Sequence, residues 1–269
     1  MGVLLEIKRI SGLEELSDME NCWNLLVNKN EIKTVFLTYE WIINWWKCFS
    51  KDKELCVLLI KKDNTPIGIA PLMITNHRGL KRMQFIGTPL VDYCDFIISE
   101  EKEVVLRLIY EYLLKEKKLW STILLEEIPE NSSTLSLSAR ILKQLTKYYG
   151  IFLTNECLSL DVSDVDERAV RKLLKKRDVS RNIKSLSEIG NVLFDEVKDV
   201  NDAYKLLETL FEHHIVIWDK KEDPSMFNEK SYREFFKGLI SDLLPKGIVK
   251  LWVLKLDQKP IAIEFGFYY

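Results

Sequence analysis

The feature that most constrains this chain is an internal repeat built around two turns. Residues 63–70, DNTPIGIA, align with residues 257–264, DQKPIAIE, about 190 positions later. Each turn follows an apolar strand. Before that strand come, in order, another strand and two segments with helical spacing. The order strand, helix, helix, strand, turn, strand therefore occurs twice, which chance produces less readily than a short match. The alternative is two unrelated hairpins that share an Asp-x-x-Pro turn.

The hydrophobic pattern predicts an α/β fold with a mixed sheet in two modules, residues 1–163 and 164–269. Asp18 is expected to cap the first helix and Gly150 to end the last helix of the first module. The expected strands of that module are 3–10, 55–60, 67–74, 83–86, 95–98, 122–128, 151–154 and 158–162, and its helices cover 19–27, 38–49, 105–112 and 138–149. The second module is expected to hold helices at 164–189, 207–218 and 232–243, and strands at 192–197, 248–256 and 261–269. If the repeat is a duplication, the counterpart of residues 81–162 is missing after Tyr269, and the second module is incomplete.

Composition narrows the class of protein. Apolar residues make up 47% and charged residues 30% of the chain, and the formal net charge is −2, so nothing global favours nucleic acid or an anionic membrane. No apolar run reaches the roughly 18 residues of a spanning helix. The five cysteines are scattered without a CxxC pair, which predicts neither a disulfide framework nor a zinc site. With no export signal, we expect a cytoplasmic protein whose chemistry needs no metal.

Several short motifs, taken in order, resemble a known group of enzymes. They are Phe36–Trp41 followed by Trp45 and Trp46, Pro66–Leu72, Gly87 with the Asp92–Asp95 segment, the basic segment 175–181, His214–Trp218 and Pro260–Ala262. Together with the element order they resemble tandem GNAT-fold acetyltransferases of cellulose and polysaccharide biosynthesis, which are related to FemABX-like peptidyltransferases. The resemblance implies transfer of an acyl group from acetyl-CoA or another acyl-CoA to an amine or hydroxyl of a small molecule or cell-envelope precursor. Transfer from aminoacyl-tRNA is the alternative, and a catalytically silent binding or scaffold protein is a third reading.

In a GNAT fold the donor pyrophosphate would lie at the start of the helix after the fourth strand, where backbone N–H groups and the helix dipole favour anions. The first module has Ser99-Glu100-Glu101-Lys102 there, with two carboxylates and no glycine, which predicts a degenerate, structural copy. Arg177, Arg181 and Lys184 in the basic stretch 168–184 are candidates for contact with the donor phosphates or tRNA. The alternative is a solvated helix face, with Leu173, Leu174 and Ile183 on its buried side.

Acceptor-binding candidates are Asp92, Tyr93, Asp95 and Trp218, although a turn held by aspartate side chains explains the first three equally well.

Candidate bases are Glu264 and His213. His213 should face outward, whereas His214 lies on an apolar stripe and is expected to pack in the core. Glu264 shares a strand face with the small residues Ala262 and Gly266, so a ligand could lie beside it; the alternative is a carboxylate that faces solvent.

Overall fold

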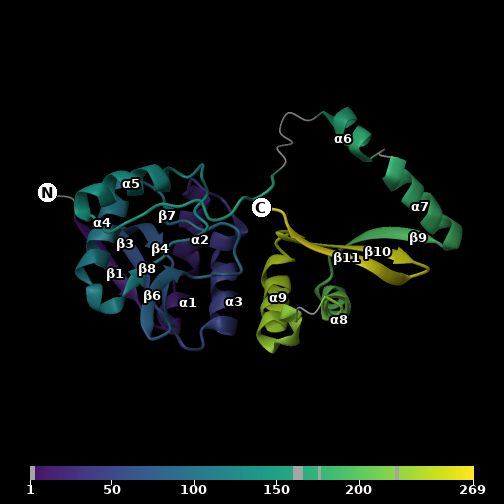
Figure 1. The fold of residues 1–269 in the computed structure, drawn as a ribbon, viewed down its shortest axis with the longest axis horizontal. Coiled ribbons are helices and arrows are strands. Elements are labelled where there is room, and N and C mark those ends of the chain that lie inside the picture. Colours follow the sequence, from purple (N-terminus) through teal and green to yellow (C-terminus); the bar gives the residue numbers. More distant parts are fainter. Residues whose placement is uncertain (1–3, 160–165, 175–176, 222–223) are drawn as a thin grey trace. The chain divides into compact units, whose positions relative to one another are not determined.

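The computed structural model describes residues 4–159, 166–174, 177–221 and 224–269 (Figure 1). The fold is mixed α/β, as predicted, and the chain divides into two compact units, Met1–Glu156 and Cys157–Tyr268. The predicted boundary between residues 163 and 164 lies outside the described ranges.

The first unit contains two four-stranded sheets. The first sheet is antiparallel and has the order β1 (Leu5–Ile10), β3 (Val57–Lys62), β4 (Thr65–Ala70) and β7 (Ile97–Ile98). The second has the order β2 (Lys53–Leu55), β5 (Leu72–His77), β6 (Leu80–Phe85) and β8 (Thr122–Ile123), in which only β6 and β8 are parallel.

The predicted strands 55–60 and 67–74 are each divided between the two sheets. The chain leaves the second sheet at Cys56, whose N–H donates to the Leu72 carbonyl (3.0 Å). Pro71 separates β4 from β5, because proline has no N–H to offer a ladder. Four consecutive residues of β3, 57–60, are buried, so both faces of this strand are covered.

Helices of the first unit are α1 (Leu13–Ser17), α2 (Glu20–Lys29), α3 (Tyr39–Phe49), α4 (Lys102–Lys115) and α5 (Ser133–Leu145), with 3₁₀ turns η1 (Val35–Leu37) and η2 (Lys117–Leu119). The hydroxyl of Thr38 caps α3 by accepting from the Trp41 N–H, and the tryptophans of this helix are buried. Asp18 does not cap α2; it ends the unpredicted helix α1.

The end of the first unit differs from the sequence-based prediction. Helix α5 begins five residues early, because Ser132 accepts from the Thr134 N–H as its cap, and it ends at Thr146 rather than Gly150. Strand β8 covers only two of the seven residues expected at 122–128. Residues 151–154 form no strand, and the second expected strand, 158–162, extends outside the described residues. These predictions failed because an extended apolar segment has the same sequence pattern whether or not it pairs with another strand.

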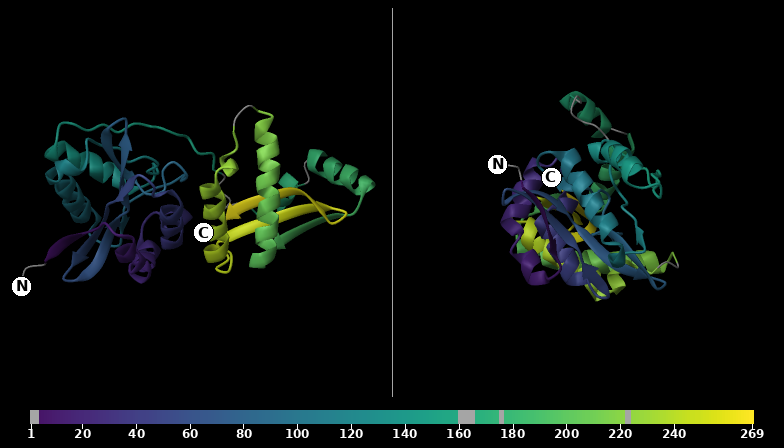
Figure 2. Two further views of the ribbon diagram at one scale, coloured as in Figure 1. Left: turned by 90° about the horizontal axis from the view of Figure 1, so that it is seen from below. Right: turned by 90° about the vertical axis from the view of Figure 1, so that its left-hand side faces the viewer.

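The second unit contains a three-stranded antiparallel sheet with α8 and α9 on one side (Figure 2). Its elements are α6 (Glu167–Leu174), α7 (Arg177–Ile189), β9 (Val192–Val197), α8 (Val200–Asp219), the 3₁₀ turn η3 (Met226–Asn228), α9 (Lys230–Leu243), β10 (Val249–Leu256) and β11 (Lys259–Phe267). Val249, Leu251 and Val253 of the central strand are buried, and this strand contacts α9. Along its other edge, β11 pairs with no described strand.

The two units share local details beyond element order. Asp63 and Asn64 have φ values of 47° and 67°, and Asp257 and Gln258 have 47° and 68°. Both hairpins also shift register at the equivalent place, where Lys61 pairs with Pro66 and Lys255 with Pro260. The hydroxyl of Thr34 caps η1, and that of Ser225 caps η3.

Within the described ranges, no helix combines the length and apolar character needed to cross a membrane.

Candidate functional site

A pocket of about 390 Å³ lies where α8 ends and η3 begins, within the second unit. Its walls are formed by His214 and Trp218 of α8 and by Pro224, Ser225, Met226, Asn228, Glu229 and Tyr232. Small-molecule sites typically have volumes of about 300–1,000 Å³, so this pocket suits a small ligand.

The imidazole of His214 is held from several directions. Its Nδ1 lies 2.8 Å from the Oγ of Ser225, and Ser225 Oγ also accepts from the Phe227 N–H (3.2 Å). The ring stacks on Trp218 with centroids 5.2 Å apart and an interplanar angle of 11°. Burial and the positive charge of Lys221 lower the pKa of His214, so its neutral form prevails near neutral pH.

Of the candidate residues predicted from the sequence of α8, one lines this pocket and one does not. Trp218 lines it, whereas His213 is exposed and is absent from its walls. His214, expected in the core, is only half-buried, and sequence reasoning missed both its pocket and its partner Ser225. The available signal was the repeat: Ser225 begins its 3₁₀ turn as Thr34 does in the first unit.

Glu264 lies on the three-stranded sheet of the second unit, on the face opposite its neighbour Phe265, whose ring contacts Phe236 of α9. The register partner of Glu264 is Trp252, and the next strand places Glu196 opposite the same tryptophan. The side chain of Glu264 is exposed, and Phe194 on this face is 69% exposed. A Cβ added to Gly266 would lie 3.4 Å from the Trp252 ring, so the indole already occupies part of the space expected for a ligand.

Arg181 and Lys184 lie on α7 at a spacing that places them on one face, and both are exposed. The side chains of Arg177, Leu173 and Leu174 lie outside the described part of the structure. Ile183 is 53% exposed, so the expectation that it forms a buried side of this helix is wrong for that residue.

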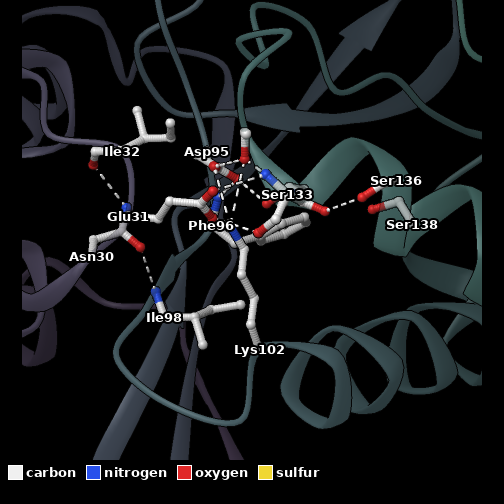
Figure 3. Close-up of polar contacts among 12 residues, drawn as sticks. Asn30, Glu31, Ile32, Asp95, Phe96, Ile98, Lys102, Ser133, Ser136 and Ser138 are labelled. Carbon is white, nitrogen blue, oxygen red and sulfur yellow. Dashed lines mark hydrogen bonds and ion pairs between the residues drawn. The ribbon is translucent and has the colours of Figure 1, made fainter.

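Asp95 is completely buried in the first unit (Figure 3). Its carboxylate accepts from the hydroxyls of Ser132 and Thr134, each at 2.6 Å, and Lys102 Nζ lies 3.8 Å away. Burial raises the pKa of Asp95, and these donors act in the opposite direction. The side chain joins β7 to the start of α5, where it is out of reach of an acceptor. The turn interpretation of this residue fits better than acceptor binding.

The two neighbours of Asp95 in the candidate list lie elsewhere. Asp92 is exposed in the loop before β7, and Tyr93 is half-buried with its ring 6.4 Å from that of Phe36. The structure therefore does not bring the three predicted acceptor residues to one surface.

The position expected for a donor loop in the first unit is occupied by ion pairs. Glu101, which precedes α4 with a φ of 50°, pairs with Lys62, while Lys102 Nζ contacts the Glu31 carboxylate at 2.7 Å. These carboxylates flank the start of α4, where a phosphate would otherwise gain from the helix dipole.

A second hollow, of about 570 Å³, lies between α8 and α9 and is lined by Tyr204, Lys205, Glu208, Glu234, Lys237, Gly238 and Ser241. Lys237 pairs with Glu208 at 2.7 Å across it, so these two charges already have partners. Among the described residues, no group of three or more His, Cys, Asp or Glu side chains is arranged to hold a metal ion.

One family model matches part of the chain. Residues 174–269 match the model described as an acetyltransferase (GNAT) domain. No curated protein matches the sequence.

Among solved structures, the fold is similar to that of FemX, with a TM-score of 0.56 and 13% identity. The match covers 94% of this chain and 58% of the FemX chain, so this chain spans little more than half the length of that protein. A ribosomal-protein-alanine N-acetyltransferase from Brucella melitensis biovar Abortus 2308 (TM-score 0.35, 12% identity, 58% of this chain and 99% of that chain) and a possible acetyltransferase from Clostridium difficile 630 (0.35, 10%, 59% and 99%) also match, at scores too low to support an argument.

Proposed function

We propose that this protein transfers an acyl group, in the first instance acetyl, from acyl-CoA to an amine or hydroxyl. The supporting observation is that the GNAT acetyltransferase match, residues 174–269, begins at the last residue of α6 and includes α7 and the β9–α8–α9–β10–β11 elements. The first unit, with its carboxylates at the start of α4, acts in this proposal as a structural copy of the same module. The acceptor is a small molecule or a cell-envelope or polysaccharide precursor, and the reaction takes place in the cytoplasm, where acyl-CoA is available.

The chemistry requires no resident metal. The acceptor attacks the thioester carbonyl, and a base removes a proton from the acceptor. Glu264 and His213 remain candidates for that base, and the exposed Arg181 and Lys184 remain candidates for donor phosphate contacts together with Arg177. Asp92 and Tyr93 remain candidates for the acceptor.

Donor binding is the direct test. A ligand that binds the folded state raises the unfolding temperature, and saturation a hundredfold above its Kd stabilises by about 2.7 kcal/mol. We expect millimolar acetyl-CoA to raise the Tm of the chain, and free thiol to appear when a primary amine is added. An unchanged Tm, together with no thiol release across a panel of amines and alcohols, would contradict the proposal.

The fold similarity to FemX over 94% of the chain favours one second candidate, transfer from aminoacyl-tRNA. The basic stretch 168–184 would then contact the tRNA backbone, and binding would fall steeply with salt because counterions are released. Filter binding with tRNA at two salt concentrations separates the candidates: tight, salt-sensitive tRNA binding without an effect of acetyl-CoA selects this one.

A further inference from the structure

His214, which borders the pocket at the end of α8, stands at a position in the repeat that a tryptophan takes in the first unit. Trp23 lies eleven residues before Thr34, and His214 lies eleven residues before Ser225, where Thr34 and Ser225 cap the equivalent 3₁₀ turns. Trp23 is fully buried and donates its Nε1–H to the Leu37 carbonyl (2.8 Å). The smaller imidazole in the second unit is half-buried and borders open space.

One ring nitrogen of His214 is engaged and the other is not. Nδ1 contacts Ser225 Oγ, and Nε2 has no hydrogen-bond partner among the described residues. When Nδ1–H donates to Oγ, Nε2 carries a lone pair that can accept a proton. The stack on Trp218 and the edge contact with Phe227, 5.0 Å between centroids, hold the ring in this orientation. A fixed, neutral imidazole beside a pocket is the arrangement that proton abstraction needs.

The pocket walls favour a positively charged ligand. Glu229 contributes a carboxylate and Tyr232 an aromatic ring, whereas the Trp218 ring is already stacked on His214 and has the ammonium of Lys221 over it. Carboxylates and aromatic faces both attract an ammonium group and repel an anion. Lys221 is absent from the pocket walls, and its ammonium lies 4.8 Å from the centroid of Trp218.

We propose that this pocket binds a primary amine acceptor that carries a ring or short apolar body, and that Nε2 of His214 removes the proton that blocks its nitrogen. The inference rests on the proposed acyl transfer, and it names the acceptor class and the base for that reaction. Ser225 is the positioning residue that orients the imidazole.

The proposed step balances as follows. One proton passes from the ammonium to Nε2, and the freed lone pair attacks the thioester carbonyl carbon of acyl-CoA. The C–N bond forms and the C–S bond breaks, so the sulfur leaves with the electron pair of that bond. The second proton on nitrogen passes to the departing thiolate, giving the amide and CoA thiol, and His214 later releases its proton to solvent.

Binding is tested by NMR on the intact chain, with three probes that share one ring. Tyramine carries an ammonium group, tyrosol a hydroxyl and 4-hydroxyphenylacetate a carboxylate. The chain has three histidines, so each imidazole Cε1–H resonance can be assigned by single substitution. We expect millimolar tyramine to shift the His214 resonance saturably, 4-hydroxyphenylacetate to leave it unchanged, and the His77 resonance to respond to none of the probes. No tyramine shift at His214, or equal shifts with all three probes, would overturn the proposal.

Catalysis is tested with His214→Asn, because the asparagine amide can replace Nδ1 at Ser225 but offers nothing at Nε2. We expect tyramine acetylation to fall by about a hundredfold to ten-thousandfold, the usual contribution of a general base. The loss should shrink as the pH approaches the amine pKa of about 10, where the acceptor deprotonates unaided. The exposed His77→Asn is the matched control and should retain full activity.

The outcomes separate this inference from the proposed function. Donor-dependent acetylation that survives in His214→Asn but is lost in His213→Asn overturns the role of His214 and leaves acyl transfer intact. A tyramine shift at His214 in a chain that neither binds nor consumes acetyl-CoA contradicts acyl transfer and, because the base then has no reaction to serve, the catalytic part of the inference as well.

Discussion

Asp63 and Asp257 form the same pair of contacts in the two units of the chain. The Oδ1 of Asp63 accepts from the Leu4 N–H (3.0 Å), and the Oδ1 of Asp257 accepts from the Asn191 N–H (2.8 Å). In each case the aspartate N–H also donates to the carbonyl of that partner, at 2.9 Å. Each aspartate thus begins a hairpin turn and fastens it to the residue that precedes the first strand of its unit.

The two turns differ in how well their second residue suits the backbone. Both central residues have positive φ, which asparagine tolerates and glutamine does not. We expect Gln258→Gly to stabilise the second unit by about 1 kcal/mol, since glycine removes the left-handed penalty. Asn64→Gly is the matched control and should give a smaller gain. Urea unfolding of both variants measures the difference, and an equal gain at the two positions would contradict the strain argument.

These turns were the part of the fold that the sequence could predict best. Asp-x-x-Pro between two apolar strands specifies a hairpin locally, and strand β9 was predicted with its observed bounds. The sequence did not reveal that the strands on either side of the first turn divide at Cys56 and Pro71 into two sheets. A continuous apolar run looks the same whether or not its ladder partner changes, because sheet membership depends on distant residues.

Asp95 should govern part of the acid stability of the first unit. Burial raises its folded pKa above the unfolded value, so the folded state binds the proton more tightly, and this contribution to stability falls as pH rises between those values. Asp95→Asn removes that titration, and the stability difference between wild type and variant should therefore change with pH above about pH 4. Urea unfolding across the acid range measures it; a constant difference would show that Asp95 does not titrate.

Removing the same side chain altogether should have a larger effect. Asp95→Ala leaves the buried hydroxyls of Ser132 and Thr134 without their acceptor, at a cost of about 1–3 kcal/mol each. The exposed Asp92→Ala is the control, and it should change the free energy of unfolding by no more than about 0.5 kcal/mol. Comparable losses from the two variants would rule out the structural role described for Asp95.

Trp23 and His214 should respond differently to truncation, because one fills a core and the other borders a pocket. Trp23→Ala is expected to destabilise the chain by about 3–5 kcal/mol, the usual loss for a buried large aromatic. His214→Ala should cost only about 1 kcal/mol, near the average for point substitutions. Chemical denaturation of both variants provides the measurement. A loss of unfolding free energy at His214 as large as that at Trp23 would show that His214 packs in the core, as its helical spacing first predicted.

That contrast also explains why only part of the site could be predicted from the sequence. A histidine at helical spacing among Leu207, Leu210 and Trp218 has the same pattern whether it packs or lines a cavity. The difference comes from Ser225, which arrives from the turn after α8 and engages Nδ1. Trp218 could be proposed from the sequence alone. The contact between His214 and Ser225 could not, because it depends on how the turn after α8 packs against the helix.

Glu264 can be compared with a neighbour that shares its surroundings. Glu264 and Glu196 both lie opposite Trp252, on either side of β10, and Glu196 pairs with Lys250 at 2.7 Å. If Glu264 is the base, Glu264→Gln should lower turnover by about a hundredfold or more without changing the Tm. Glu196→Gln should leave turnover unchanged. Equal turnover in the wild type and both variants would remove Glu264 from the candidate bases.

The pH profile of turnover distinguishes His214 from either carboxylate. An imidazole must be neutral to accept a proton, and burial with the nearby charge of Lys221 lowers the pKa of His214 below its ordinary value of about 6.5. Ser225 contacts the ring, Glu229 and Tyr232 share the pocket walls with it, and Lys221 lies over the Trp218 ring that stacks on it. We therefore expect kcat/KM to fall as pH decreases through a value below about 6.5. His214→Asn should abolish that limb, while His77→Asn keeps it. A limb that persists in His214→Asn would assign the titration to another group and transfer the role of base to it.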